Sequence, residues 1–216
     1  ELPQPTIHRL VRTLLAMGYV RQLPNRHYAL GPSLIRLGDS AAQLIGAWSR
    51  SLLGELVHRT GETANMAVLD NDMAIYVAQV PSPHAMRMFT EVGRRVHAHC
   101  TGVGKALLMQ LPNEAVLALV KRTGMPASTE TSHTAARTLL RDIELCRSRG
   151  YTVDEGEQEL GVRCIAVPVP DAPTLTAISI SGPAARLTLK SATKVVPLLK
   201  RVARDLASEF DREAAV

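Results

Sequence analysis

Aromatic residues are scarce in this sequence. Phe, Trp and Tyr together make up 3% of its 216 residues. Carbohydrate grooves and single-strand nucleic-acid platforms depend on stacking aromatic rings, so the composition disfavours both classes. Long apolar runs are lacking as well: none approaches the ~20 residues that cross a bilayer, and no signal-peptide pattern opens the chain. These absences predict a soluble, cytoplasmic protein with no membrane partner.

Cysteine is also rare, and the three present include no CxxC pair. A disulfide scaffold and a zinc ribbon are therefore disfavoured, and a reducing compartment is the natural setting. Cys100 or Cys164 beside a histidine could form a nucleophile, but no orienting acid or oxyanion loop is evident near them. His97 and His99 share a strand face and could hold a metal with Cys164 or Asp154, although two histidines are a thin ligand set. We expect no catalytic residue, no metal site and no cofactor.

Positive charge concentrates at the N-terminal end. The chain carries 25 basic and 20 acidic residues, a net charge of +5. The first 60 residues hold seven arginines against three acids, which accounts for +4 of that charge. A basic segment on a nearly neutral body predicts a polyanion-binding module joined to a domain with another task. Ordinary fluctuation of surface charge is the alternative.

Residues 4–17 have the pattern of an amphipathic helix. Pro5 suits its first turn and Gly18 its C-terminal stop. An apolar stripe repeats with spacings of three and four, and we expect it to be buried; it consists of Ile7, Leu10, Val11, Leu14 and Leu15. The other face carries the short polar groups and arginines that base edges and phosphates require. These are Thr6, Arg9 and Thr13, flanked by Gln4, His8 and Arg12.

Two short strands, 19–22 and 27–30, are predicted around the turn Pro24-Asn25. A helix followed by a β-hairpin is the second half of a winged helix-turn-helix, in which basic wing residues reach the DNA backbone. The wing candidates are Arg21, Arg26 and His27. The alternative is a surface helix and hairpin with no role at DNA.

The run from Leu2 to Leu10 (LPQPTIHRL), then Gly18-Tyr19-Val20 and Tyr28-Ala29-Leu30-Gly31, resembles the recognition helix and wing of IclR-family transcriptional regulators. The resemblance implies which residues lie nearest operator DNA: Gln4, Pro5, Thr6, His8 and Arg9, with Arg12 near the backbone and Arg26 on the wing. Family members begin tens of residues earlier. We therefore expect this chain to be part of a longer native protein and to bind DNA poorly by itself.

A new helical pattern follows the break at residues 31–33. Its apolar positions alternate spacings of three and four, like the seam of a short coiled coil; they are Leu34, Leu37, Ala41, Leu44 and Trp48. A helix packed on its own domain is the alternative. The resemblance favours a linker helix at 32–51 that helps to form a homo-dimer or tetramer on double-stranded, pseudo-palindromic operator DNA.

From residue 52 onward, strands and helices alternate in a pattern typical of an α+β domain. Strands are predicted at 63–69, 73–80, 86–92, 95–99, 151–155, 164–169 and 174–181. Helices are predicted at 103–110, 113–122, 135–149 and 189–210. The resemblance implies a GAF-like effector-binding domain at 52–216 with a curved antiparallel sheet, following a partial winged helix-turn-helix at 1–31. It is carried by Gly150–Asp154, Glu157, Cys164–Ala166, Val169 and Asp171, and departs at Pro170.

Residues 101–105 (TGVGK) are similar to a phosphate-binding loop. That interpretation fails, because His99 stands where a glycine is needed and Ala106 where Ser or Thr is needed. A glycine-containing helix start with free N–H groups still suits a small carboxylate. The alternative is a tight strand-to-helix turn. The resemblance implies that Gly102 and Val103 border an effector pocket.

Two serines complete the candidate pocket. Ser179 and Ser181 lie two apart on a strand, so both hydroxyls point to one face. With Asp154 and Cys164 they could fix a polar ligand, while Val96 and Met88 supply apolar wall; a solvated strand face is the alternative. The sequence thus predicts a ligand-responsive transcriptional regulator, a repressor in type, controlled by a small organic acid. A stand-alone metabolite-binding module and a metal-dependent hydrolase are the rival hypotheses.

Overall fold

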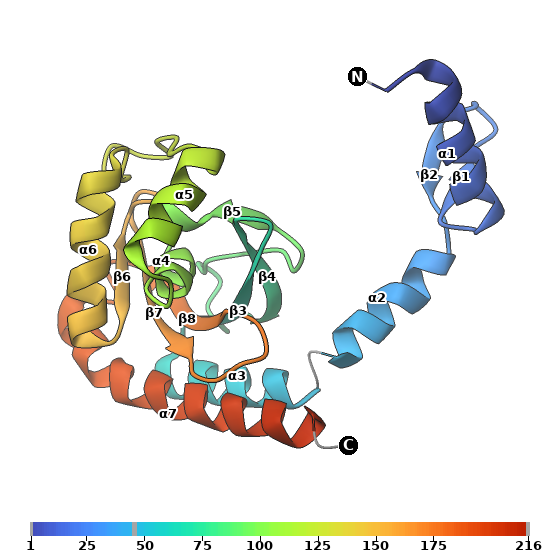
Figure 1. The fold of residues 1–216 in the computed structure, drawn as a ribbon. Helices are drawn as coiled ribbons and strands as arrows, with labels where there is room; N and C mark the ends of the chain where they lie inside the picture. Colours follow the sequence, from blue (N-terminus) through green and yellow to red (C-terminus); the bar gives the residue numbers. More distant parts are fainter. Residues whose placement is uncertain (1, 45–46, 215–216) are drawn as a thin grey trace. The chain divides into compact units, whose positions relative to one another are not determined.

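The computed structural model describes residues 2–44 and 47–214 of the chain, which form two compact units, residues 1–47 and 48–216. Each unit has its own secondary structure (Figure 1). No helix within the described ranges is long and apolar enough to span a membrane.

The first unit contains a helix, a hairpin and a second helix: α1 (Gln4–Ala16), β1 (Val20–Gln22), β2 (Tyr28–Leu30) and α2 (Ser33–Leu44). Gly18, at φ +72°, ends α1, because its N–H bonds Leu15 O at 3.0 Å and the next N–H bonds Leu14 O at 2.9 Å. The strands pair antiparallel, with Arg21 opposite Ala29. The predicted helix and hairpin are confirmed.

The prediction of a buried stripe on α1 is wrong. None of the helix's residues is buried, and Ile7, Leu10 and Leu14 are 47%, 49% and 39% exposed. Only Val11 and Leu15 of the stripe are half-buried. The physical reason is that β1 covers one side of the helix, while no other element within residues 2–44 covers the rest of the stripe.

The seam predicted from Leu34 to Trp48 does not run through one described helix. α2 ends at Leu44, residues 45 and 46 lie outside the described ranges, and Trp48 belongs to α3 (Ala47–Thr60) in the second unit. There the Trp48 ring meets Phe210 edge to face, with ring centroids 5.0 Å apart. Trp48 therefore packs against its own unit.

One antiparallel sheet organises the second unit. Its strands are β3 (Thr63–Asp70), β4 (Met73–Val80), β5 (Arg95–His97), β6 (Thr152–Glu155), β7 (Val162–Val169) and β8 (Thr176–Pro183), in the order β5-β4-β3-β8-β7-β6. The sheet curls around the helix α4 (Gly102–Leu108) (Figure 1). The predicted α+β class with a curved antiparallel sheet is confirmed.

Helices cover both faces of this sheet (Figure 1). On one face α4 packs beneath α5 (Asn113–Thr123) and α6 (Ala136–Arg149). On the other face α7 (Leu189–Ala214) packs on β7 and β8 beside α3. Because strand side chains alternate, Ile178 and Ile180 point away from α4, while Ala177, Ser179 and Ser181 share its face.

Two predicted strands need correction. Residues 86–92 form no strand, because carbonyls of this segment bond side chains instead: Met88 O accepts from Thr63 Oγ1 at 2.9 Å, and Met86 O accepts from Arg186 at 2.9 Å. The strand predicted at 95–99 ends at His97, where a 3-10 turn over Ala98–Cys100 leads into α4.

Candidate effector site and DNA-facing helix

The first turn of α4 is set by its sequence. Thr101 caps the helix, because its hydroxyl accepts the Gly104 N–H at 3.1 Å. All seven residues of α4 are buried. Three of them join an apolar cluster with small residues of the sheet, and its members include Val103, Ala106, Leu107, Ala67, Ala166 and Ala177. Small sheet residues thus let the helix lie close to the strands.

Gly102 lies where backbone and sheet come closest. A Cβ at this position would fall 2.6 Å from Cys164 Sγ, so no other residue fits without movement. Thr152 Oγ1 also donates to Gly102 O at 2.8 Å. The start of α4 therefore packs tightly against β6 and β7. The N–H of Val103 points at the Cys164 sulfur.

Beyond the reach of α4, the same sheet face is polar and buried. Ser179 on β8 stands opposite Asn65 on β3, and Asn65 stands opposite Gln79 on β4. Asn65 Nδ2 donates to Ser181 Oγ at 3.0 Å and, at 3.4 Å, to Ser179 Oγ. Gln79 Nε2 donates to Asn65 Oδ1 at 2.9 Å. The solvated face considered as an alternative is excluded, because Ser179 and Asn65 are 0% and 1% exposed.

A second polar row crosses the sheet one step away. Asp154 on β6 faces Cys164 on β7, which faces Ser181 on β8. Burial raises the pKa of Asp154 to about 7, with the Glu157 carboxylate adding to the effect, although Asp154 Oδ1 accepts the Glu157 N–H at 2.7 Å. Burial likewise raises the pKa of Cys164 to about 12. These groups present hydrogen-bond donors as well as acceptors.

The structure thus brings five predicted effector residues to one face of the sheet: Gly102, Asp154, Cys164, Ser179 and Ser181. Val96 and Val103 lie in the adjoining apolar cluster. Met88 is half-buried in the irregular segment after β4. Sequence reasoning missed Asn65, which is detectable as a lone amide within the apolar run of β3.

Tyr76 and Gln79, both on β4, were also missed. Burial raises the pKa of Tyr76, and the nearby Cys164 and Asp154 add to that effect, so its hydroxyl stays protonated beside them. Gln79 is placed by its bond to Asn65. Neither residue has a sequence signal of its own, because only strand pairing brings β4 beside β3 and the serines.

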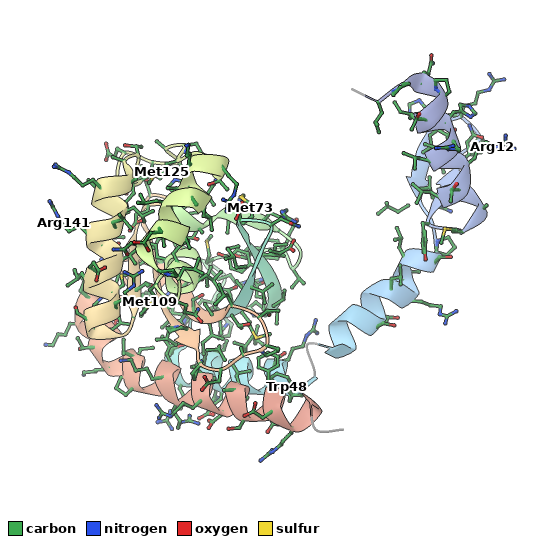
Figure 2. All side chains as sticks on the ribbon, viewed as in Figure 1. Arg12, Trp48, Met73, Met109, Met125 and Arg141 are labelled. Atoms are coloured by element: carbon green, nitrogen blue, oxygen red, sulfur yellow. The ribbon has the colours of Figure 1, made fainter. Side chains whose placement is uncertain are left out.

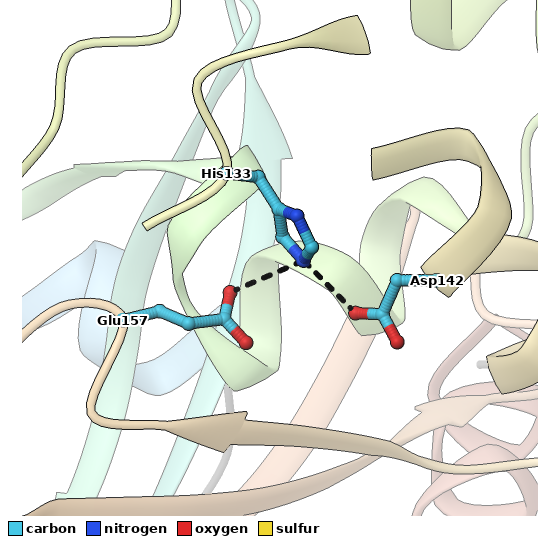
Figure 3. Close-up of side chains that lie close together, drawn as sticks. All are labelled: His133, Asp142 and Glu157. Carbon is cyan, nitrogen blue, oxygen red and sulfur yellow. Dashed lines mark hydrogen bonds and ion pairs between the residues drawn. The ribbon is translucent and has the colours of Figure 1, made fainter. Parts of the chain in front are cut away.

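Lys105 is fully buried, which no pattern in the sequence predicts. Its ammonium donates to Asp142 Oδ2 and Val153 O at 2.7 Å and to Glu157 Oε1 at 2.5 Å. Burial alone would lower the pKa of Lys105, but the two carboxylates outweigh it and raise the pKa. Figure 3 shows His133 beside these carboxylates, 3.3 Å from Asp142 and 3.8 Å from Glu157. The lysine of the TGVGK run is thus part of an internal ion-pair cluster.

The catalytic and metal alternatives find little support at the histidine pair. Burial raises the pKa of Cys100 to about 11, so it is a thiol and a poor nucleophile. The rings of His97 and His99 lie 5.3 Å apart. Among the described residues they form no three-ligand group with Cys164 or Asp154.

On α1 a groove runs along the polar face, lined by Pro5, His8, Arg9, Arg12, Thr13 and Ala16. Arg12 projects from this helix (Figure 2). Gln4 and Thr6 lie outside the groove. Arg26 is exposed at the tip of the hairpin, in a left-handed conformation with φ 67°.

Comparisons with known proteins agree with this architecture. The family described as "Bacterial transcriptional regulator IclR C-terminal" matches residues 42–208, and the "IclR helix-turn-helix domain" matches residues 1–24. The transcriptional repressor IclR of Escherichia coli K12 is 37% identical over 97% of this chain and 79% of its own length. The repressor AllR of the same organism is 34% identical over 99% of this chain and 81% of its own length.

The crystal structure of Thermotoga maritima IclR superposes with a TM-score of 0.78 at 26% identity, covering 97% of this chain and 86% of that one. Both units are included in these matches, and the named relatives are repressors. The chain belongs to the IclR family of bacterial transcriptional regulators, and it is a ligand-responsive DNA-binding regulator, not an enzyme.

Proposed function

We propose that this regulator binds double-stranded operator DNA through α1 and the β1–β2 wing and acts as a repressor. Binding of a small organic acid in the second unit shifts its affinity for the operator. A homo-dimer or tetramer in the cytoplasm would present two copies of α1 to a pseudo-palindromic site. The exposed basic face of α1 supports the first step, and the buried polar rows beside Gly102 support the second.

Residues at the N-terminal half of α1 are the proposed readers of the operator. Arg9 and His8 line the exposed groove, where a guanidinium or imidazole can meet base edges in the major groove. Gln4, Pro5 and Thr6 would approach the same groove from the first turn of the helix. Arg12, further along the helix, and Arg26, on the wing, would neutralise phosphates.

Arg9→Ala in the native protein tests the DNA-binding role. We expect operator affinity to fall about 10- to 100-fold, a loss of about 1–3 kcal/mol, because one base or phosphate contact is removed. Gel shifts and fluorescence anisotropy at fixed salt provide the measurement. Arg137→Ala, an exposed arginine of α6, is the matched control and should leave binding unchanged. Equal operator affinity in Arg9→Ala and the parent protein would contradict the assignment of α1 as reader.

The effector is proposed to be a small acid that also carries a hydroxyl or oxo group. One observation carries this proposal: the buried row Asp154–Cys164–Ser181 lies against the start of α4. The N–H groups at the start of α4 are already engaged, since the Gly104 N–H bonds Thr101 Oγ1 and the Val103 N–H faces Cys164 Sγ, so the hydroxyl groups of the row are the donors left for a carboxylate. An ionised Asp154 would repel the same carboxylate, whereas a protonated Asp154 donates a hydrogen bond to it. Serine hydroxyls and the Asn65 amide suit the second polar group.

A thermal-shift screen of the native protein against hydroxy-acids, oxo-acids and aromatic acids tests this site. A true effector raises the Tm with its concentration, because it binds only the folded state. Ser181→Ala should reduce that shift, while Ser148→Ala, on the surface of α6, should not. If no acid shifts the Tm, or if Ser181→Ala responds like the parent, the pocket proposal fails.

A further inference from the structure

The side chains of His133, Asp142 and Glu157 converge from three separate segments. His133 precedes α6, Asp142 lies within α6, and Glu157 follows β6 (Figure 3). Within the described part of the chain they form the one group of three metal-ligating side chains whose donor atoms all lie within 4.8 Å of one another. His133 Nε2 hydrogen-bonds Asp142 Oδ2 at 3.3 Å and lies 3.8 Å from Glu157 Oε2.

One donor atom in this group is buried and lacks a hydrogen-bond partner. Glu157 Oε1 accepts from Lys105, but Glu157 Oε2 has no hydrogen-bond partner, although the side chain is only 8% exposed. A buried carboxylate oxygen normally has a hydrogen bond or a cation beside it. This oxygen points toward His133 Nε2, so lone pairs without a hydrogen-bond donor face the centre of the three-residue group (Figure 3).

The charges of the cluster also leave room for a further cation. Lys105 supplies one positive charge, and Asp142 and Glu157 supply two negative charges. The two carboxylates therefore carry one negative charge more than Lys105 balances. The ammonium of Lys105 uses one oxygen of each carboxylate, which leaves Glu157 Oε2 and Asp142 Oδ1 without an ammonium contact.

The site is reachable from solvent. His133, Asp142 and Glu157 line a pocket of about 750 Å³, together with Arg141, Arg149 and apolar side chains. Arg141 projects outward from α6 (Figure 2), and Arg149 is engaged with Tyr151 O at 2.7 Å. An ion can therefore enter through the pocket, and a water can complete its coordination from the same side.

We propose that His133, Asp142 and Glu157 bind a Zn²⁺ ion, a site separate from the effector site. One imidazole and two carboxylates are zinc ligands, with bonds of about 2.0–2.2 Å. Two ligands of a tetrahedral ion with such bonds lie about 3.3–3.5 Å apart. His133 Nε2 lies 3.3 and 3.8 Å from the two carboxylate oxygens, and all three donor atoms lie within 4.8 Å of one another, so binding needs only a small inward movement of the side chains. The fourth position faces the pocket. The ion lies across the two carboxylates from Lys105, which accounts for the unpartnered oxygen.

Zinc titration of the chelator-treated native protein tests this proposal, with calorimetry and a competing zinc indicator as the two readouts. We expect one tight equivalent of Zn²⁺ per chain. His133→Ala should weaken binding by at least 10-fold, because one of three ligands is lost. His58→Ala, an exposed histidine on α3, is the matched control and should bind as the parent does.

Co²⁺ substitution separates this site from the cysteines and from the His97–His99 pair. We expect a tetrahedral Co²⁺ spectrum with no thiolate charge-transfer band, retained in His97→Ala and lost in His133→Ala. The metal-free melting temperature of His133→Ala reports folding, and His133→Gln replaces it if the alanine variant fails to fold. The proposal is overturned if the parent binds no zinc, if His133→Ala binds as tightly as the parent, or if the Co²⁺ spectrum shows thiolate ligation.

Discussion

Two helices of this protein reverse the usual relation between hydropathy and burial. The leucine-rich α1 has no buried residue, whereas α4, which carries a lysine, is buried at all seven positions. Leu10 is 49% exposed and Lys105 is 0% exposed. The difference lies in what surrounds each helix: α1 is covered by one short hairpin, while α4 is enclosed by the curled sheet and by α5 and α6 (Figure 1). Whether a helix is buried therefore depends on the elements that the fold packs around it, and not on its own hydropathy alone.

Removing the buried ammonium of α4 should have the largest effect. Lys105→Met leaves Asp142 and Glu157 facing each other with no lysine between them, and breaking a buried ion pair costs about 3–5 kcal/mol. Urea unfolding gives the free energy directly. Lys121→Met, an exposed lysine of α5, should change it by less than about 0.5 kcal/mol. If Lys105→Met were no worse than Lys121→Met, the cluster would not stabilise the fold.

Asp154 should make the stability depend on pH. Its pKa is 3.8 as a free group and about 7 in the folded protein, so the folded state holds a proton that the unfolded state releases. Stability contributed by this group is full below pH about 4 and is lost as the pH rises to about 7, by at most about 4 kcal/mol. Asp154→Asn cannot ionise and still accepts the Glu157 N–H. From pH 4 to 7 the unfolding free energy of the parent should therefore fall relative to that of Asp154→Asn. An unchanged difference between the two proteins over this range would contradict the raised pKa of Asp154.

The close approach at Gly102 should give an intermediate effect. Gly102→Ala places a methyl group 2.6 Å from Cys164 Sγ, and such overpacking costs about 1–3 kcal/mol. Cys164→Ala in the same chain removes the sulfur and should recover part of the loss. The control is Gly54→Ala in α3, where a Cβ meets nothing within 4 Å and the helix gains stability. Thermal unfolding of the parent and these three variants decides between steric conflict and a general intolerance of alanine.

The smallest effect should come from the exposed leucines of α1. In a chain of these 216 residues, Leu10→Ala should change the unfolding free energy by less than about 0.5 kcal/mol, because the side chain is already half in water. Leu107→Ala on α4 should lose about 2–5 kcal/mol, since it empties a fully buried site. Similar losses at both positions would show that Leu10 is covered in solution.

Periodicity and turn residues were sufficient to predict most elements of the fold. α1 ends at Gly18, as the glycine there predicts, and the hairpin follows directly. Residues 86–92 show the limit, because alternating apolar residues form a strand only where another strand supplies hydrogen bonds. Here Thr63 and Arg186 bond the carbonyls instead.

The candidate effector site was predicted in part. Ser179 and Ser181 share a face because strands alternate, which is a local property. Their neighbours Asn65 and Gln79 come from strands about 100 residues away in sequence, and only the register of β3 between β4 and β8 brings them together. The cluster of Lys105 with His133, Asp142 and Glu157 is likewise assembled from distant segments.

The amino-acid sequence alone determined the family, the helix-hairpin order at the N-terminal end and the α+β class, because these follow from local spacing and recognisable motifs. The tertiary structure decided which side chains are buried and which charges meet: the leucines of α1 lie in solvent, and Lys105 lies in the interior. Burial and ion pairing depend on distances between segments far apart in sequence, and only the folded chain sets those distances.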